Sequence, residues 1–254
     1  MDSCRQAPAA IPERRFIVVF DLNGIFCHIM HRPRNMVAVP TWIMQDRPLD
    51  RTPAFIGQKV VLARSGYKMF WEKMNKMFYL CIWSSMRKQT VDLVVEYLFA
   101  GMPKPCLVLA QEDCTEFKDM WGNIVMNPLK PQSPLFLKSL VSKFWWPPIS
   151  LDNGRITATS SNTILVDDCP YKSACNPDEN GLFPDTFTTN RVHDADMTEV
   201  LLPYFQSLFY SSMTDIRDFV VRRRFGQQPI RHNDALKMAI LKSNKFNGPE
   251  LNPV

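Results

Sequence analysis

The sequence contains few glycines and no apolar stretch long enough to cross a membrane. Glycine occurs 9 times in 254 residues and proline 20 times, which predicts stiff connections between elements. No apolar run approaches the roughly 18 residues of a membrane helix, so we expect no membrane span. The opening residues, MDSCRQAPAAIPERRF, contain Asp2 and Glu13 and lack an apolar core, so we expect no targeting peptide there.

The cysteines lack the paired spacing of a zinc site. Their number is odd, and no two of them are spaced as CxxC. Several lie in apolar runs such as FYLCIW, so we expect reduced, mostly buried thiols and a nuclear or cytoplasmic protein. The net charge of +5 permits acidic partners but gives no strong signal for nucleic acid. The seven cysteines are Cys4, Cys27, Cys81, Cys106, Cys114, Cys169 and Cys175.

What the sequence does contain is an alternation of short apolar runs and helical patterns. Apolar, β-rich runs predict buried strands at 16–20, 78–83, 106–111 and 163–168, with a further short strand at 59–63. Amphipathic spacing predicts helices over 67–77, 87–100 and 197–212, and a short one around 134–145. This order is typical of an α/β domain with a mostly parallel sheet. From about residue 217 we expect a basic, then polar, tail that frays.

Polar side chains stand at the carboxyl ends of three of the four main predicted strands. Asp21 comes at the end of the first, Ser84 and Ser85 at the end of the second, and Asp167 with Asp168 at the end of the last. Ligands bind at the carboxyl ends of parallel strands, so we expect these groups around one crevice.

This set of groups suits magnesium and phosphoryl chemistry. Carboxylates hold Mg²⁺, and a carboxylate can attack phosphorus to give an aspartyl-phosphate. The Ser84 hydroxyl can donate to a phosphoryl oxygen, and a lysine can neutralise charge in the transition state. Lys138, just before the last strand in FLKSL, is the candidate lysine.

Each of these residues also has an ordinary structural interpretation. Asp21 can cap a helix, and Asp167-Asp168 can form a turn before Pro170; for both we favour the site. The two serines can equally well cap the helix at 87–100. Surface lysines are common, so residue chemistry alone says little about Lys138.

The order of these motifs resembles the haloacid dehalogenase superfamily, in particular the FCP/SCP-type phosphatases of the RNA polymerase II C-terminal domain. FIVVFDLNGI, from residue 16, is similar to the first motif of that family, and LCIWSSM, from residue 80, to the second. LARSGYKMF, from residue 62, is similar to its Arg-Pro-Gly segment, with Ser65 in place of proline. Lys138 matches the lysine motif, and ILVDDCP, from residue 164, is similar to the acidic motif.

The resemblance implies a three-layer Rossmann-like sandwich and a role for each matching residue. Asp21 would be the nucleophile, and the hydroxyls of Ser84 and Ser85 would bind phosphate. Asp168 would ligate Mg²⁺, while Asp167 would either ligate it or orient Lys138. The main-chain oxygen of residue 23 would also face the metal. The implied substrate is a phosphorylated protein or peptide.

The resemblance also divides the chain. It predicts a flexible arm over 1–14, the FCP/SCP-like domain over 15–219 and a basic or polar tail over 220–254. An insertion near 26–57 is expected to form a flap over the crevice.

Asn23 departs from the phosphatase pattern, which has a second aspartate at this position. That aspartate protonates the leaving group and then activates water, a contribution typically worth about 10²–10⁴ in rate. An amide cannot move that proton. The enzyme would then be slow with a long-lived phosphoenzyme, or restricted to good leaving groups, or a binding module without turnover.

The sequence therefore supports two functions. The first is a magnesium-dependent phosphatase that acts through Asp21 on phosphoserine or phosphothreonine proteins and is slowed by Asn23. The second is a catalytically inactive binding module, similar to the mitochondrial presequence-translocase receptor subunit, which would imply a mitochondrial protein. The retained set of Asp21, Ser84, Lys138 and Asp168 favours the first.

Overall fold

The structure, a computed structural model, describes residues 13–33, 36, 53–118, 121–127, 130–188 and 196–230. Most of the predicted flap, most of the predicted N-terminal arm and the chain beyond residue 230 lie outside the described residues. Among the helices that are described, none has the length and apolar character needed to span a bilayer.

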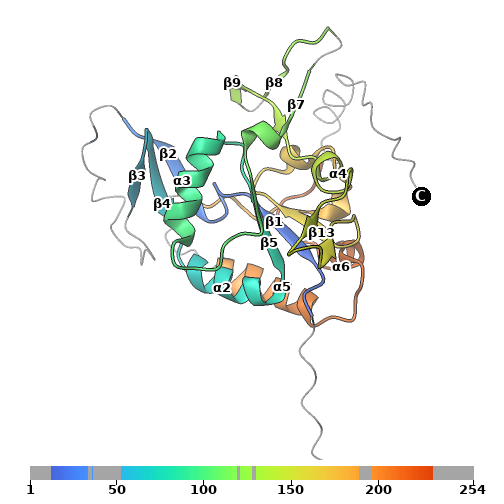
Figure 1. Cartoon of the computed structure of the whole chain (residues 1–254). Coiled ribbons are helices and arrows are strands. Elements are labelled where there is room, and N and C mark those ends of the chain that lie inside the picture. Colours follow the sequence, from blue (N-terminus) through green and yellow to red (C-terminus); the bar gives the residue numbers. More distant parts are fainter. Residues whose placement is uncertain are drawn as a thin grey trace, which may run out of the picture.

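A five-stranded parallel sheet forms the centre of the molecule (Figure 1). Its order is β14–β13–β1–β5–β6, and every neighbouring pair is parallel. The strands are β1 (Ile17–Phe20), β5 (Tyr79–Trp83), β6 (Leu107–Leu109), β13 (Thr163–Val166) and β14 (Gly181–Leu182). The four strands predicted for the main sheet are confirmed. The two-residue strand β14 is too short to give a sequence signal.

Side chains of β1 alternate between two buried layers, as the two-residue period of a strand requires. Val18 and Phe20 pack among helices on one face, while Ile17 and Val19 face the other layer. The first layer contains α2 (Tyr67–Met77), α3 (Lys88–Phe99), α5 (Leu202–Phe209) and α6 (Ile216–Arg222). The second contains α4 (Leu140–Lys143) and the antiparallel pair β11 (Ser150–Leu151) and β12 (Ile156–Thr157). The predicted three-layer sandwich is confirmed.

Smaller elements surround this sandwich. An antiparallel sheet of order β2–β4–β3 stands beside α3 (Figure 1) and includes the two described ends of the predicted flap. Its strands are β2 (Cys27–His31), β3 (Ala54–Ile56) and β4 (Lys59–Ala63). Two more antiparallel pairs join β7 (Thr115–Glu116) to β10 (Phe136–Leu137) and β8 (Met126–Asn127) to β9 (Lys130–Pro134). The short helical turns are η1 (Gln111–Asp113), η2 (Pro170–Ser173), η3 (Asp178–Asn180) and η4 (Asp196–Leu201).

Three predicted segments differ from the structure. The helix expected around 134–145 is wrong for most of its length, because Phe136 and Leu137 pair with β7 and only one turn, α4, follows. The helix expected over 197–212 begins as the π-helical turn η4 and continues as α5 to Phe209. The chain after 217 does not fray there, because Phe219 and Val220 of α6 are buried in the core.

Candidate active site

The first acidic residues of the site lie side by side because their strands are neighbours. Phe20 at the end of β1 pairs with Val166 at the end of β13. Asp21 and Asp167 therefore begin adjacent loops, and the N–H of Asp21 donates to the carbonyl oxygen of Val166 at 2.9 Å. Asp21 is 1% exposed, and neither Asp167 nor Asp168 is more than 6% exposed. The predicted grouping of these carboxylates is what the sheet register produces.

Lys138 reaches this cluster from the segment between β10 and α4. Its Nζ lies 3.1 Å from Asp21 Oδ1 and 2.5 Å from Asp167 Oδ2. The side chain is fully buried. A buried ammonium group is stable only when it is paired, so these two carboxylates are the reason that Lys138 can lie here.

Lys172, which the sequence analysis did not select, is a second buried lysine in the same cluster. Its Nζ lies 2.5 Å from Asp21 Oδ2, 3.1 Å from Asp167 Oδ1 and 3.9 Å from Asp168 Oδ1. It belongs to η2, which begins at Pro170 directly after the acidic pair. Its position four residues after Asp168, within one helical turn, is the sequence signal that could have identified it.

Electrostatics within the cluster separate the two adjacent aspartates. Burial alone would raise the pKa of Asp167, but the ammonium groups of Lys138 and Lys172 outweigh it and lower the pKa. Burial, followed by the negative charges of Asp167 and Asp21, raises the pKa of Asp168 to about 6. Burial opposes the charge of Lys172, but the nearby carboxylates raise its pKa well above the ordinary value. Asp168 is therefore the carboxylate with the least compensated charge.

The loop after β1 passes very close to Asp168. A Cβ atom added at Gly24 would lie 2.1 Å from Asp168 Oδ2, and the φ angle of Gly24 is +84°. The carbonyl oxygen of Gly24 accepts from the N–H of Phe187 at 2.9 Å. The buried guanidinium of Arg64, in the segment similar to Arg-Pro-Gly, donates to the carbonyl oxygen of Ile25 at 3.1 Å. Glycine at position 24 allows the acidic loops to approach each other.

Asn23 lies in this loop and turns its amide oxygen toward β2. Its Oδ1 accepts a hydrogen bond from the N–H of Ile29 at 2.7 Å. The residue is partly buried. The side chain at the position of the missing aspartate is thus used in holding β2 against the loop.

The two serines lie at the carboxyl end of β5, as predicted. Ser84 is buried, and its Oγ accepts from the N–H of Met86 at 3.4 Å, while Ser85 is partly exposed. Neither serine caps α3, because the first N–H of that helix, from Lys88, donates instead to the carboxylate of Glu112.

The geometry also tests the structural interpretations of the aspartates, a helix cap for Asp21 and a turn for Asp167. Asp21 Oδ1 accepts from the N–H of Leu22 at 2.8 Å, but no helix begins at this point. Asp167 Oδ1 accepts from the N–H of Cys169 at 2.9 Å. Asp167 is therefore both a turn-forming residue and a member of the cluster.

Comparison with known proteins identifies the family. The family described as NLI interacting factor-like phosphatase matches residues 16–217, most of the chain. The chain belongs to this family. Phosphatases of this family generally use Mg²⁺.

Two solved structures resemble the chain at low identity. A variant of the fission yeast RNA polymerase II CTD phosphatase Fcp1 bound to beryllium fluoride is 13% identical, with a TM-score of 0.43 over 89% of this chain and 51% of that chain. Fcp1 described as an essential RNA polymerase II CTD phosphatase is 14% identical, with a TM-score of 0.43 over 88% and 61%. This chain thus spans less than two thirds of each. No curated protein matches it.

The donor set of this phosphatase-family site suits Mg²⁺, which prefers carboxylate oxygens. Asp168 Oδ1 is buried and has no hydrogen-bond partner among the described residues. Asp167 and Asp168 each offer a carboxylate oxygen here, whereas the neighbouring Cys169 thiol is too soft a ligand for Mg²⁺. An unpaired buried carboxylate oxygen is costly unless a cation compensates it, so the residues fit a metal.

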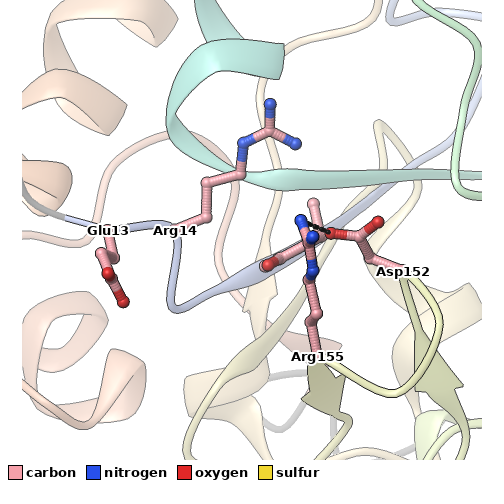
Figure 2. Close-up of a pocket in the computed structure, with 5 residues that line it drawn as sticks. Glu13, Arg14, Asp152 and Arg155 are labelled. Carbon is pink, nitrogen blue, oxygen red and sulfur yellow. Dashed lines mark hydrogen bonds and ion pairs between the residues drawn. The ribbon is translucent and has the colours of Figure 1, made fainter.

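A separate cavity of about 730 Å³ lies at the other end of the central strands, away from the candidate site. Glu13 and Arg14, before β1, and Tyr79, at the start of β5, line it. Asp152 and Arg155 lie together on one side of it (Figure 2), and a guanidinium nitrogen of Arg155 is 3.5 Å from a carboxylate oxygen of Asp152. The cavity is at the amino ends of the strands and includes none of the candidate residues.

Proposed function

We propose that this chain is a slow phosphatase that acts through an aspartyl-phosphate at Asp21. The observation that carries the proposal is the position of the Asp21 carboxylate, buried at the end of the central strand with an ammonium group near each oxygen. That arrangement supports an anionic nucleophile and provides positive charge for the phosphoryl oxygens. The membership in a phosphatase family supports the same reaction class.

The proposed reaction has two steps. In the first, a carboxylate oxygen of Asp21 forms a bond to phosphorus while the bond from phosphorus to the ester oxygen breaks. The leaving alkoxide takes a proton from solvent, because Asn23 has none to give. In the second step, water attacks phosphorus and releases inorganic phosphate and the Asp21 carboxylate. Without a general acid and base, both steps are expected to be slowed by about 10²-fold or more.

The remaining roles follow from position. Ser84 and Ser85 would donate to phosphoryl oxygens, and Lys138 would hold Asp21 and Asp167 in place. Mg²⁺, held by Asp21, Asp168 and the main-chain oxygen of Asn23, would add positive charge at the phosphoryl group when bound. Asp167 is engaged by both lysines, which supports the orienting role rather than the ligand role.

The proposed substrate is a phosphoserine or phosphothreonine in a protein or peptide. This proposal is supported by the family and by the resemblance of the motifs to those of FCP/SCP-type phosphatases. A nuclear or cytoplasmic location is also proposed, on the reduced, mostly buried thiols expected from the sequence.

A second candidate function is a binding module without turnover. One observation favours it: Asn23 stands in place of the proton-transferring aspartate. Under this alternative the site would hold a phosphorylated segment, as an assembly factor or as an import factor in the mitochondrion.

Hydrolysis of p-nitrophenyl phosphate tests the two functions. The aryl leaving group needs little proton help, so the natural chain is expected to turn it over slowly, and more slowly without Mg²⁺. Asp21→Asn should abolish turnover, whereas Asn23→Asp should raise it by about tenfold or more. Activity only in Asn23→Asp would support the binding module with a preserved site. No activity in any of the three chains would overturn the phosphatase proposal.

A further inference from the structure

The two lysines of the cluster use different oxygens of the same two carboxylates. Lys138 contacts Asp21 Oδ1 and Asp167 Oδ2, while Lys172 contacts Asp21 Oδ2 and Asp167 Oδ1. Two main-chain N–H groups, those of Leu22 and Cys169, also donate to this pair. All four oxygens of Asp21 and Asp167 are therefore already in contact with an ammonium group.

Asp168 is the exception. Within the part of the chain that the structure describes, its Oδ1 is buried without a hydrogen-bond partner. It lies 3.9 Å from the Nζ of Lys172, beyond hydrogen-bond distance. Lys172 is thus the cation toward which one oxygen from each of the three aspartates is turned. Oxygens of several carboxylates around one point are the environment that a hard divalent cation requires.

Lys172 cannot share this position with a metal ion. Mg²⁺ approaches its oxygen ligands to about 2.0–2.1 Å, and a second cation between the same oxygens is opposed by repulsion and by steric overlap. The side chain is 8% exposed, so the ammonium group is held inside the cluster rather than at its edge. Lys138 contacts the other oxygen of Asp21 and of Asp167.

We propose that the ammonium group of Lys172 occupies the cation position of this site, so that a divalent cation binds only after Lys172 withdraws. The natural chain then binds Mg²⁺ weakly, and removing this one charge creates a strong site. The inference rests on the proposed function only in taking Asp21 and Asp168 as the carboxylates that face the metal.

Titration of the full chain with Mn²⁺, followed by the electron paramagnetic resonance signal of the free ion, tests the proposal. Lys172→Met removes the charge but keeps an unbranched side chain, and is expected to bind Mn²⁺ about tenfold or more tightly than the natural chain. Lys172→Arg keeps the charge and is expected to bind no more tightly than the natural chain. Equal affinities in the natural chain and Lys172→Met would overturn the proposal.

Lys143→Met is the matched control. Lys143 pairs with Asp113 at 2.7 Å at the surface, outside the cluster, so its loss is expected to leave Mn²⁺ affinity unchanged. If Lys143→Met tightened binding as much as Lys172→Met, a general charge effect would replace the specific one.

Two further measurements keep the proposal testable if Lys172→Met is unstable. Buried carboxylates left without Lys172 should make folding depend on a cation, so Mg²⁺ is expected to raise the melting temperature of this variant and not that of the natural chain. Tight Mn²⁺ binding by the natural chain itself would overturn the proposal without any variant. Metal binding is measured without turnover, so failure of the phosphatase proposal and failure of this one give different results.

Discussion

At the scale of single residues, the site depends on charges and close approaches that few other side chains would permit. Asp21, Asp167 and Asp168 are buried beside Lys138 and Lys172, and Gly24 allows the loop after β1 to approach Asp168. Substitutions should have large effects at the residues where two loops approach closely and at the carboxylate with the least compensated charge.

Gly24 is one such residue. Gly24→Ala would place a methyl group 2.1 Å from Asp168 Oδ2 at a φ of +84°, so we expect the free energy of unfolding to fall by about 3 kcal/mol or more. Gly57→Ala is the control, because Gly57 also has a positive φ, +57°, and no atom of the described residues lies within 4 Å of the added Cβ. Its cost should be only about 1 kcal/mol, measured for both variants by urea unfolding. Equal losses would mean that the approach to Asp168 is unimportant.

Asp168 should make the stability of the metal-free protein depend on pH. Its pKa in the folded chain is about 6, above the ordinary value of 3.8, so its ionisation disfavours the folded state. The stability that protonated Asp168 contributes is complete below about pH 4 and is lost as the pH rises through 6. The difference between the two pKa values corresponds to a loss of about 3 kcal/mol in the free energy of unfolding at pH 7.

Asp168→Asn removes this ionisation. In a chelating buffer the variant should be more stable than the natural chain by up to about 3 kcal/mol at pH 7, with the difference vanishing near pH 4. Asp152→Asn is the control, because Asp152 lies in the cavity at the amino ends of the strands. It should change the free energy of unfolding by less than about 0.5 kcal/mol. A difference for Asp168→Asn that does not vary with pH would contradict the assigned cause.

At the scale of elements, α6 and the residues after it help to hold the loop that contains Asp167 and Asp168. Val220 of α6 is fully buried, and the side-chain amide of Gln227 donates to the main-chain oxygen of Asp168 at 2.8 Å. The same amide donates to the carbonyl oxygen of Pro184 at 3.1 Å. Residue 219, the predicted domain boundary, lies inside this helix.

A chain that ends at residue 219 should therefore be less stable than one that ends at residue 230. The shorter chain loses the buried Val220 and the hydrogen bonds of Gln227, which together are expected to contribute at least about 2 kcal/mol. The chain ending at 230 keeps every contact described above and is the matched control. Thermal unfolding of the two chains compares them directly, and identical melting temperatures would show that the segment after 219 is dispensable.

At the scale of the whole molecule, one parallel sheet brings together residues that are far apart in the chain. Asp21, Ser84 and Asp167 follow strands β1, β5 and β13, which are neighbours in the order β13–β1–β5. This arrangement could be predicted from sequence, because each strand is a short apolar run with a polar group directly after it. The roles assigned to these residues stay predictions until activity is measured.

The class of fold, the central strands and the acidic groups at their ends could be predicted from the sequence, because hydrophobic periodicity and strand-end position are local properties. The tertiary structure was needed to show that Phe136 and Leu137 form a strand, since their partner β7 lies about 20 residues earlier in the chain. It alone also decided that Lys172 is buried against Asp21, 151 residues away. A lysine looks the same in sequence at the surface and in a carboxylate cluster, and the difference arises only when distant segments pack together.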